Sequence, residues 1–297
     1  MTGKKVGFIG VGTMGRLMAE RLMDAGVNLQ IFDVSAEAAQ HFIDKGVTAA
    51  ASPRALGAWA DILILMLPQP DNVRDCILGA EGAIHSLRPG CLVIDMSTSG
   101  PGVVRECGAC LADRGINMID APVGKNPAAA LRGDLMVLMG GEQDTCRSVE
   151  WLLRSMGSEL HYCGPLGSGQ VVKLLNNMVS CTNAATLAEA YKVARTAGVD
   201  WSVLTKVMSG TAADSWQLRN TVMSKALQGD FEPAFRLSLA QKDMSLAVEM
   251  AKFFDMDSPC TSSALEWYKR ASAAGFGELD RAALFLLADP TLKNAKK

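Results

Sequence analysis

Four polar side chains at helical spacing are the first candidates for chemistry in this sequence. Lys173 is followed by Asn176, Asn177 and Ser180, three, four and seven residues further on, within a mostly apolar stretch. In an α-helix these positions share one face. A lysine there can hold or release a proton, while an asparagine can orient a substrate oxygen. The pattern alone also fits a solvated face or a polar seam between two domains.

A second group of residues has the spacing of a dinucleotide-binding turn. Gly10, Gly12 and Gly15 follow an apolar run and open a helical pattern. Gly10 allows a tight turn, Gly12 lets the backbone approach a pyrophosphate, and Gly15 lets helix and strand pack closely. The helix start, with Thr13 and Met14, is expected to offer N–H groups to the phosphates.

An acidic residue at the end of the second apolar run bears on the choice of cofactor. Asp33 stands 23 residues after Gly10, where a carboxylate can accept hydrogen bonds from an adenosine ribose. A carboxylate repels a 2′-phosphate, and Val34 and Ser35 provide no arginine to bind one. We therefore expect NAD(H) to be preferred over NADP(H).

Alternating apolar runs and helical patterns predict the scaffold that positions these residues. Strand and helix alternate for about half of the chain, which is typical of an α/β domain whose parallel sheet carries helices on both faces. The expected strands are residues 5–9, 28–32, 62–67, 91–95, 116–120, 135–139 and 159–162.

The alternation of strand and helix patterns ends at the glycine-rich segment GPLGSGQ, residues 164–170. Only helical patterns follow this segment. We predict an α/β nucleotide-binding domain of residues 1–164, then an all-helical domain of residues 165–297. A long helix at about 168–197 is expected to run between them.

Composition excludes several classes of partner. The 297 residues carry 29 Lys+Arg against 31 Asp+Glu, so no broad basic field favours nucleic acid. The densest apolar run, 62–67, is far shorter than the roughly 20 residues that span a bilayer. The first ten residues lack the pattern of a signal peptide. We expect a soluble, cytoplasmic protein without a membrane segment.

Cysteine spacing gives no sign of a metal site. The eight cysteines follow no regular framework, and Cys107 and Cys110 form a lone CxxC. A zinc site needs a second pair of suitable ligands. We therefore expect no metal.

The whole chain resembles the β-hydroxyacid dehydrogenases, the family that includes 3-hydroxyisobutyrate dehydrogenase and tartronate semialdehyde reductase. The resemblance covers about residues 5–285. It is carried, in order, by the segments GFIGVGTMGRLM, LMLPQPDNVRDCILGAEG, VIDMSTSGP, DAPVGKNPAAALRGDLMVLMGG, GPLGSGQVVKLLNNM and LAQKDMSLA.

This resemblance implies a Rossmann-type domain, a long interdomain helix and a helical domain that assists dimerisation. It implies Lys173 as the general acid/base and Asn177 as its catalytic neighbour, which holds the substrate. Further implied contacts are to the cofactor from Leu67, Pro68, Thr98 and Lys242, and to the substrate from Ser97. On the polar face of the helix, Asn176 and Ser180 are expected to hold the acidic end of the substrate.

One segment departs from the family pattern. Most members have Asp-Ala-Pro-Val-Ser-Gly-Gly, whose backbone binds the substrate carboxylate, whereas this chain continues with Gly124, Lys125 and Asn126. The family's sulfolactaldehyde reductases have Gly-Arg-Thr at this point. We expect these three residues, together with Asn176 and Ser180, to hold the acidic end of the substrate, although an ammonium lacks the planar fork of a guanidinium.

Together these features predict an NAD-dependent oxidoreductase. We expect hydride transfer between the nicotinamide and a short 3-hydroxy acid or its semialdehyde, of the 3-hydroxyisobutyrate, succinic or tartronate type. Reduction of 3-sulfolactaldehyde to 2,3-dihydroxypropane-1-sulfonate is the alternative, and a non-catalytic dinucleotide-binding protein is a further one. The helical domain is compatible with a homodimer or homotetramer.

Overall fold

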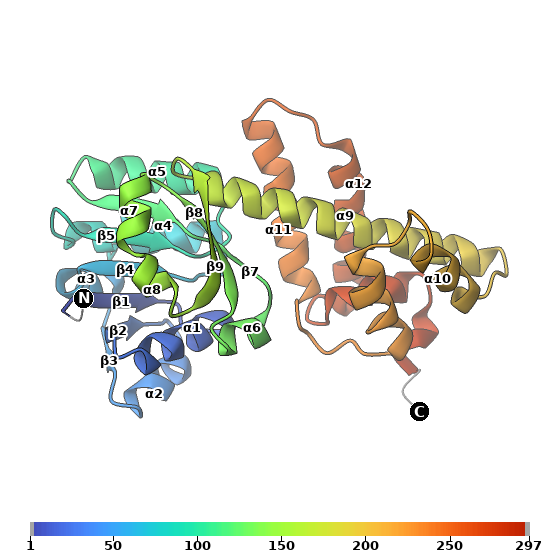
Figure 1. The fold of residues 1–297 in the computed structure, drawn as a ribbon, viewed down its shortest axis with the longest axis horizontal. Coiled ribbons are helices and arrows are strands. Elements are labelled where there is room, and N and C mark those ends of the chain that lie inside the picture. Colours follow the sequence, from blue (N-terminus) through green and yellow to red (C-terminus); the bar gives the residue numbers. More distant parts are fainter. Residues whose placement is uncertain (1–2, 295–297) are drawn as a thin grey trace. The chain divides into compact units, whose positions relative to one another are not determined.

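The computed structural model describes residues 3–294. The chain divides into two compact units, Met1–Lys173 and Leu174–Lys297. The division falls within one uninterrupted helix, α9 (Ser168–Thr196), which is visible as the longest ribbon in Figure 1. The boundary at 164/165 expected from the sequence lies just before this helix.

The first unit is built on a single sheet. Its strands are β1 (Lys5–Ile9), β2 (Asn28–Phe32), β3 (Thr48–Ala49), β4 (Ile62–Leu65), β5 (Leu92–Asp95), β6 (Asn117–Asp120), β7 (Val123–Gly124), β8 (Leu135–Gly140) and β9 (Gly157–Gly164). They lie in the order β3-β2-β1-β4-β5-β6-β8-β7, with β9 paired to β8. The parallel order of the first six strands is that of a Rossmann fold.

Each strand predicted from the sequence is present; two have the predicted ends, and the ends of the others are shifted by at most two residues. The two-residue strands β3 and β7 were not predicted. The sheet also departs from the expected parallel arrangement, because β8 runs antiparallel to β6 and β7. After β7 the chain reverses through one short helix, and this leads directly into an antiparallel partner.

Helices cover both faces of this sheet, as expected from the alternating pattern (Figure 1). Val6 and Phe8 of β1 pack with α1, α2, α6, α7 and α8. Ile9 of the same strand packs with α3, α4 and α5 on the opposite face, because successive side chains of a strand alternate. The bounds are α1 (Thr13–Asp24), α2 (Ala36–Ile43), α3 (Pro53–Trp59), α4 (Pro70–Leu78), η1 (Ala83–His85), α5 (Pro101–Ala112), α6 (Pro127–Leu131), α7 (Gln143–Ser148) and α8 (Glu150–Leu153).

Side-chain caps start several of these helices. The Ser35 hydroxyl accepts a hydrogen bond from the N–H of Ala38 at 3.2 Å, and Ser52 does the same for Ala55 at 3.1 Å. By contrast, α1 has Gly12 as its N-cap residue and no side-chain cap among the described residues. Its first N–H groups therefore remain for a ligand.

The second unit is helical. Its elements are the rest of α9, then α10 (Trp201–Ser209), η2 (Leu218–Met223), η3 (Ala226–Gln228), α11 (Leu237–Phe253), α12 (Pro259–Ala271), η4 (Ser272–Phe276), η5 (Arg281–Leu287) and η6 (Pro290–Asn294). Its core is formed by apolar residues of α9, η2, α11, α12 and η5. Tyr191 packs edge-on against Trp201 and Phe285 there. Within residues 3–294 no helix has the length and apolar character needed to cross a membrane.

Candidate active site

The turn between β1 and α1 has the geometry that a dinucleotide requires. Gly10 adopts φ +89°, and a Cβ there would collide with the carbonyl oxygen of Met66. A Cβ on Gly15 would collide with the carbonyl oxygen of Gly10, whereas a Cβ on Gly12 would meet open space. Two glycines are therefore needed for packing, and the third leaves the backbone open for a pyrophosphate. Thr13 and Met14 form the first turn of α1.

Asp33 is held at the end of β2 by two backbone hydrogen bonds. Its Oδ2 accepts from the N–H of Val11 at 2.7 Å, and its Oδ1 accepts from the N–H of Ser35 at 2.8 Å. Each carboxylate oxygen has a further lone pair, so the group can still accept ribose hydroxyls. Val34, beside it, is 93% exposed and carries no charge.

The loops after β4 and β5 are joined by Ser97. Its hydroxyl accepts from the N–H of Leu67 at 2.9 Å, and its own N–H donates to Asp95 at 3.0 Å. Ser97 is fully buried, so its side chain joins the two loops, while Thr98 beside it is half-buried. Pro68 follows Leu67 at the surface.

Gln170, in the first turn of α9, fastens the loop after β5 to that helix. Its Oε1 accepts from the N–H groups of Ser99 at 3.0 Å and Gly100 at 3.1 Å. Its Nε2 donates to the carbonyl oxygen of Ser97 at 2.8 Å. Gln170 is completely buried, and all of these partners are main-chain groups. The loop that carries Thr98 is therefore fixed relative to the start of α9.

Asp120 caps the same helix from the end of β6. Its two oxygens accept from the N–H groups of Gly167 and Gln170, both at 2.7 Å. Burial raises the pKa of Asp120 to about 7, against the opposing effect of the two N–H donors. Gly169 is required here, because a Cβ would collide with the carbonyl oxygen of Leu138 in β8. The glycine-rich segment thus lets α9 start directly against the sheet.

Lys173 lies on α9 three residues after Gln170 and is half-buried. Because the helix is uninterrupted, the contacts of Gln170 and Asp120 also fix the direction in which position 173 faces. Asn177 follows one turn later on the same face, as the sequence predicted.

A buried carboxylate orients Asn177. Asp243, on α11, is only 3% exposed and accepts a hydrogen bond from Asn177 Nδ2 at 2.7 Å. The other Asp243 oxygen lies 3.2 Å from Nζ of Lys242. Asn176 donates to Asn177 Oδ1 at 3.1 Å. The amide of Asn177 therefore presents its oxygen, not its NH2 group, on the side away from Asp243.

The segment that departs from the family pattern forms ion pairs of its own. Gly124 ends β7, and Lys125 follows it with φ +73°. Lys125 Nζ lies 3.1 Å from Asp134 and 2.8 Å from Glu159, and the hydrogen bond with Glu159 is the largest of the effects that raise its pKa. Asn126 caps α6 through its Oδ1. The charge of Lys125 is thus met by two carboxylates of its own unit.

Ser180, the last of the four polar residues on α9, contacts two other helical segments. Its hydroxyl accepts from Gln217 Nε2 at 2.6 Å and from Arg281 Nη1 at 3.4 Å. Neither partner was identified from the sequence.

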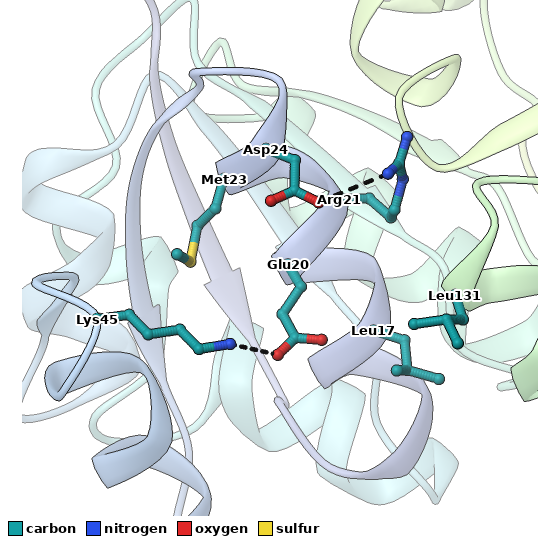
Figure 2. Close-up of a pocket in the computed structure, with 7 residues that line it drawn as sticks. All are labelled: Leu17, Glu20, Arg21, Met23, Asp24, Lys45 and Leu131. Carbon is teal, nitrogen blue, oxygen red and sulfur yellow. Dashed lines mark hydrogen bonds and ion pairs between the residues drawn. The ribbon is translucent and has the colours of Figure 1, made fainter.

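A surface hollow of about 380 Å³ lies on the C-terminal half of α1, beyond the glycine turn (Figure 2). Its charged lining residues are already paired: Lys45 with Glu20 at 2.7 Å, and Arg21 with Asp24 at 3.5 Å. None of the residues that sequence analysis selected lines it.

The cysteines show no reactive arrangement. Burial raises the pKa of Cys107 to about 12 and that of Cys146 to about 11. All eight cysteines are free thiols. Among residues 3–294 no cluster of three or more His, Cys, Asp or Glu side chains could hold a metal ion.

Sequence comparison places both parts of the chain. Residues 5–164 match the profile described as the NAD binding domain of 6-phosphogluconate dehydrogenase. Residues 167–288 match the profile described as NAD-binding of NADP-dependent 3-hydroxyisobutyrate dehydrogenase. The 3-sulfolactaldehyde reductase of Escherichia coli K12 is 39% identical over 279 residues, which cover 94% of each chain. The chain belongs to the 3-hydroxyisobutyrate dehydrogenase-like β-hydroxyacid dehydrogenases.

Other members support this assignment. The NAD-dependent L-serine dehydrogenase of Pseudomonas aeruginosa is 33% identical, over 97% of this chain and 99% of that one. The solved 3-hydroxyisobutyrate dehydrogenase of Mycobacterium tuberculosis with L-serine superimposes with a TM-score of 0.89 at 30% identity, covering 97% of this chain and 100% of that chain. This β-hydroxyacid dehydrogenase is therefore an oxidoreductase that binds a nicotinamide dinucleotide.

The sequence did not reveal the residues that position the predicted catalytic side chains of this dehydrogenase. Gln170 and Asp120 lie within segments that carry the family resemblance, yet nothing in their spacing shows which main-chain groups they bind. Asp243 follows Lys242 in the segment QKD, and a carboxylate in an apolar helical pattern was the available signal for it.

Proposed function

We propose that this protein catalyses reversible hydride transfer between NAD(H) and a short 3-hydroxy acid or its semialdehyde, with Lys173 as the general acid/base. The observation that carries the proposal is the anchoring of α9. Asp120 and Gln170 fix the turn before Lys173, and Asp243 fixes the amide of Asn177 one turn after it. Such fixed positions favour a proton donor that must meet one atom of a substrate.

Several residues of the chain would each have one role in the reaction. The nicotinamide supplies or accepts the hydride. In reduction, protonated Lys173 donates its proton to the oxygen of the aldehyde as the alkoxide forms; in oxidation, neutral Lys173 removes the hydroxyl proton. Asn177 Oδ1 accepts a hydrogen bond from the ammonium or the hydroxyl. Ser97 holds the loop that carries Thr98, which would contact the cofactor.

The glycine turn fits a dinucleotide, and Asp33 favours NAD over NADP. The uncapped start of α1 and the open space beside Gly12 suit a pyrophosphate. The carboxylate of Asp33, fixed by two N–H groups, would repel a 2′-phosphate, and exposed Val34 offers no counter-charge. Leu67 and Pro68 would flank the adenosine, and Lys242 would reach the cofactor from α11.

We also propose that residues 1–164 and 165–297 act as the nucleotide-binding and the substrate and dimerisation domains. The two profile matches, 5–164 and 167–288, agree with this division. The protein would assemble as a homodimer or homotetramer, which gel filtration with light scattering would test.

Reduction of 3-sulfolactaldehyde is the second candidate activity. It is favoured by the 39% identity to the Escherichia coli enzyme of that name and by the Gly124-Lys125-Asn126 segment. A sulfonate has three oxygens, which suits additional donors. In this segment, however, Lys125 is already paired with Asp134 and Glu159.

Turnover with a panel of substrates tests both candidates. NADH oxidation would be measured with succinic, tartronic and methylmalonic semialdehydes and with 3-sulfolactaldehyde. Lys173→Ala should reduce kcat by at least about 100-fold, the range of general acid–base catalysis, while NADH binding stays unchanged. Lys252→Ala, which removes an exposed lysine of α11, is the matched control. Normal turnover by the Lys173→Ala variant would refute the mechanism.

A further inference from the structure

An arginine that the sequence did not single out stands beside the polar face of α9. Arg281 Nη1 donates to the hydroxyl of Ser180 at 3.4 Å. Its guanidinium carbon lies 5.5 Å from the ring centre of Trp216 and 5.6 Å from that of Phe235. Asp280, the residue before it, is buried and accepts the N–H groups of Ala234 and Phe235, so the backbone that carries Arg281 is fixed.

The guanidinium of Arg281 lies against aromatic rings instead of an acidic side chain. No carboxylate of residues 3–294 forms an ion pair with it. A guanidinium that stacks on aromatic faces keeps the N–H groups of its edge for an anion in the same plane. Trp216 is 62% exposed, so this cluster reaches the surface of its unit. Lys125, by contrast, already holds two carboxylates.

The neighbouring hydroxyl is arranged as a second donor. Ser180 Oγ accepts hydrogen bonds from both Gln217 Nε2 and Arg281 Nη1. Gln217 is itself fixed, because its Oε1 accepts from the hydroxyl of Thr221 at 2.6 Å. A hydroxyl has two acceptor lone pairs and one hydrogen. With both lone pairs used and no acceptor for the hydrogen among the described residues, the Ser180 O–H is left to donate.

We propose that Arg281 and Ser180 form the site that binds the acidic group, carboxylate or sulfonate, of the substrate. This inference rests on the proposed function, because it places the acid at the far end of the face that carries Asn177. Along α9, Ser180 lies about 4.5 Å beyond Asn177. A four-carbon semialdehyde has three C–C bonds of about 1.5 Å each, so its extended chain covers about 4 Å and can reach from one position to the other.

Kinetics with charged and neutral aldehydes test the assignment. Arg281→Met should lower kcat/KM for succinic semialdehyde about 10- to 100-fold, the range expected when a charged hydrogen bond is lost. It should leave kcat/KM for butanal, which has no acidic group, unchanged. Ser180→Ala should give a smaller loss confined to the acid. The matched control is Arg270→Met, which removes an arginine stacked on Trp267 at 5.3 Å.

Equilibrium binding separates this inference from the proposed reaction. Calorimetry with butanoate and with propanesulfonate, each in the presence of NADH, requires no turnover and compares the two anion classes. Weaker binding of either anion by the Arg281→Met variant would support the proposed site. The Arg281→Lys variant should recover part of the lost affinity. Unchanged binding, or equal losses with succinic semialdehyde and butanal, would overturn the assignment. Failure of the wild-type protein to reduce any aldehyde would refute the proposed function instead.

Discussion

Replacing Gln170 should damage both stability and turnover, because one side chain satisfies three buried main-chain groups. Gln170→Ala leaves the carbonyl of Ser97 and the N–H groups of Ser99 and Gly100 without their partner. Each unsatisfied buried group costs about 1–3 kcal/mol, so the free energy of unfolding should fall by at least about 3 kcal/mol. Because the loop is released from α9, kcat should fall as well.

The assay is urea denaturation followed by circular dichroism, together with steady-state kinetics. Gln170→Glu separates the contribution of the acceptor Oε1 from that of the donor Nε2, since it keeps an acceptor oxygen and replaces only the NH2 group. When protonated, the glutamate can still donate to Ser97, so its deficit should shrink at low pH. Gln143→Ala, at an exposed position of α7, is the control. A loss of stability for Gln170→Ala no larger than that of the control would refute the reasoning.

Three other expectations follow from the geometry. Asp243→Asn should lower kcat by about 10-fold or more with little change in unfolding free energy, because the new amide lets Asn177 turn its NH2 group outward; unchanged kcat would contradict this. The carboxyl of Asp120 titrates near 3.8 when unfolded and at about 7 when folded. Protonated Asp120 therefore contributes to the free energy of unfolding fully below pH 3.8, and this contribution is lost as the pH rises through 7. In denaturant titrations, the free energy of unfolding of the Asp120→Asn variant should depend less on pH than that of the wild type. Gly15→Ala should abolish NADH binding or folding, whereas Gly12→Ala should fold normally and bind NADH more weakly, as calorimetry would show; equal behaviour of the two variants would contradict the assigned roles.

Repeating patterns made the scaffold predictable from the sequence. Buried strands such as β4 (Ile62–Leu65) are continuous apolar runs, and the spacing of Gly10, Gly12 and Gly15 is tied to backbone geometry. The two-residue strands β3 and β7 were not predictable, because a pair of residues has no periodicity. β7 also includes Gly124, a residue type that usually marks a turn.

The partners of the polar residues could not be predicted in the same way. Lys125 pairs with Asp134 and Glu159, which are 9 and 34 positions away and meet it only through the pairing of the sheet strands. Arg281 lies 101 positions from Ser180. Composition suggests which residues can bind an anion, but burial and long-range pairing decide which charge remains available.

The anchoring of α9 at its first turn has a consequence for insertions and deletions. A helix advances about 1.5 Å and turns about 100° with each residue. One residue inserted between Gln170 and Lys173 would rotate the lysine by more than a quarter of a turn, although every contact of Asp120 and Gln170 would survive. The same insertion after Ser180 would leave all four polar residues in phase and rephase only the core residues that follow, such as Ala184 and Tyr191. Length changes in this helix should therefore abolish catalysis without unfolding the α/β unit when they fall before Lys173. When they fall after Ser180, they should disturb the helical core first.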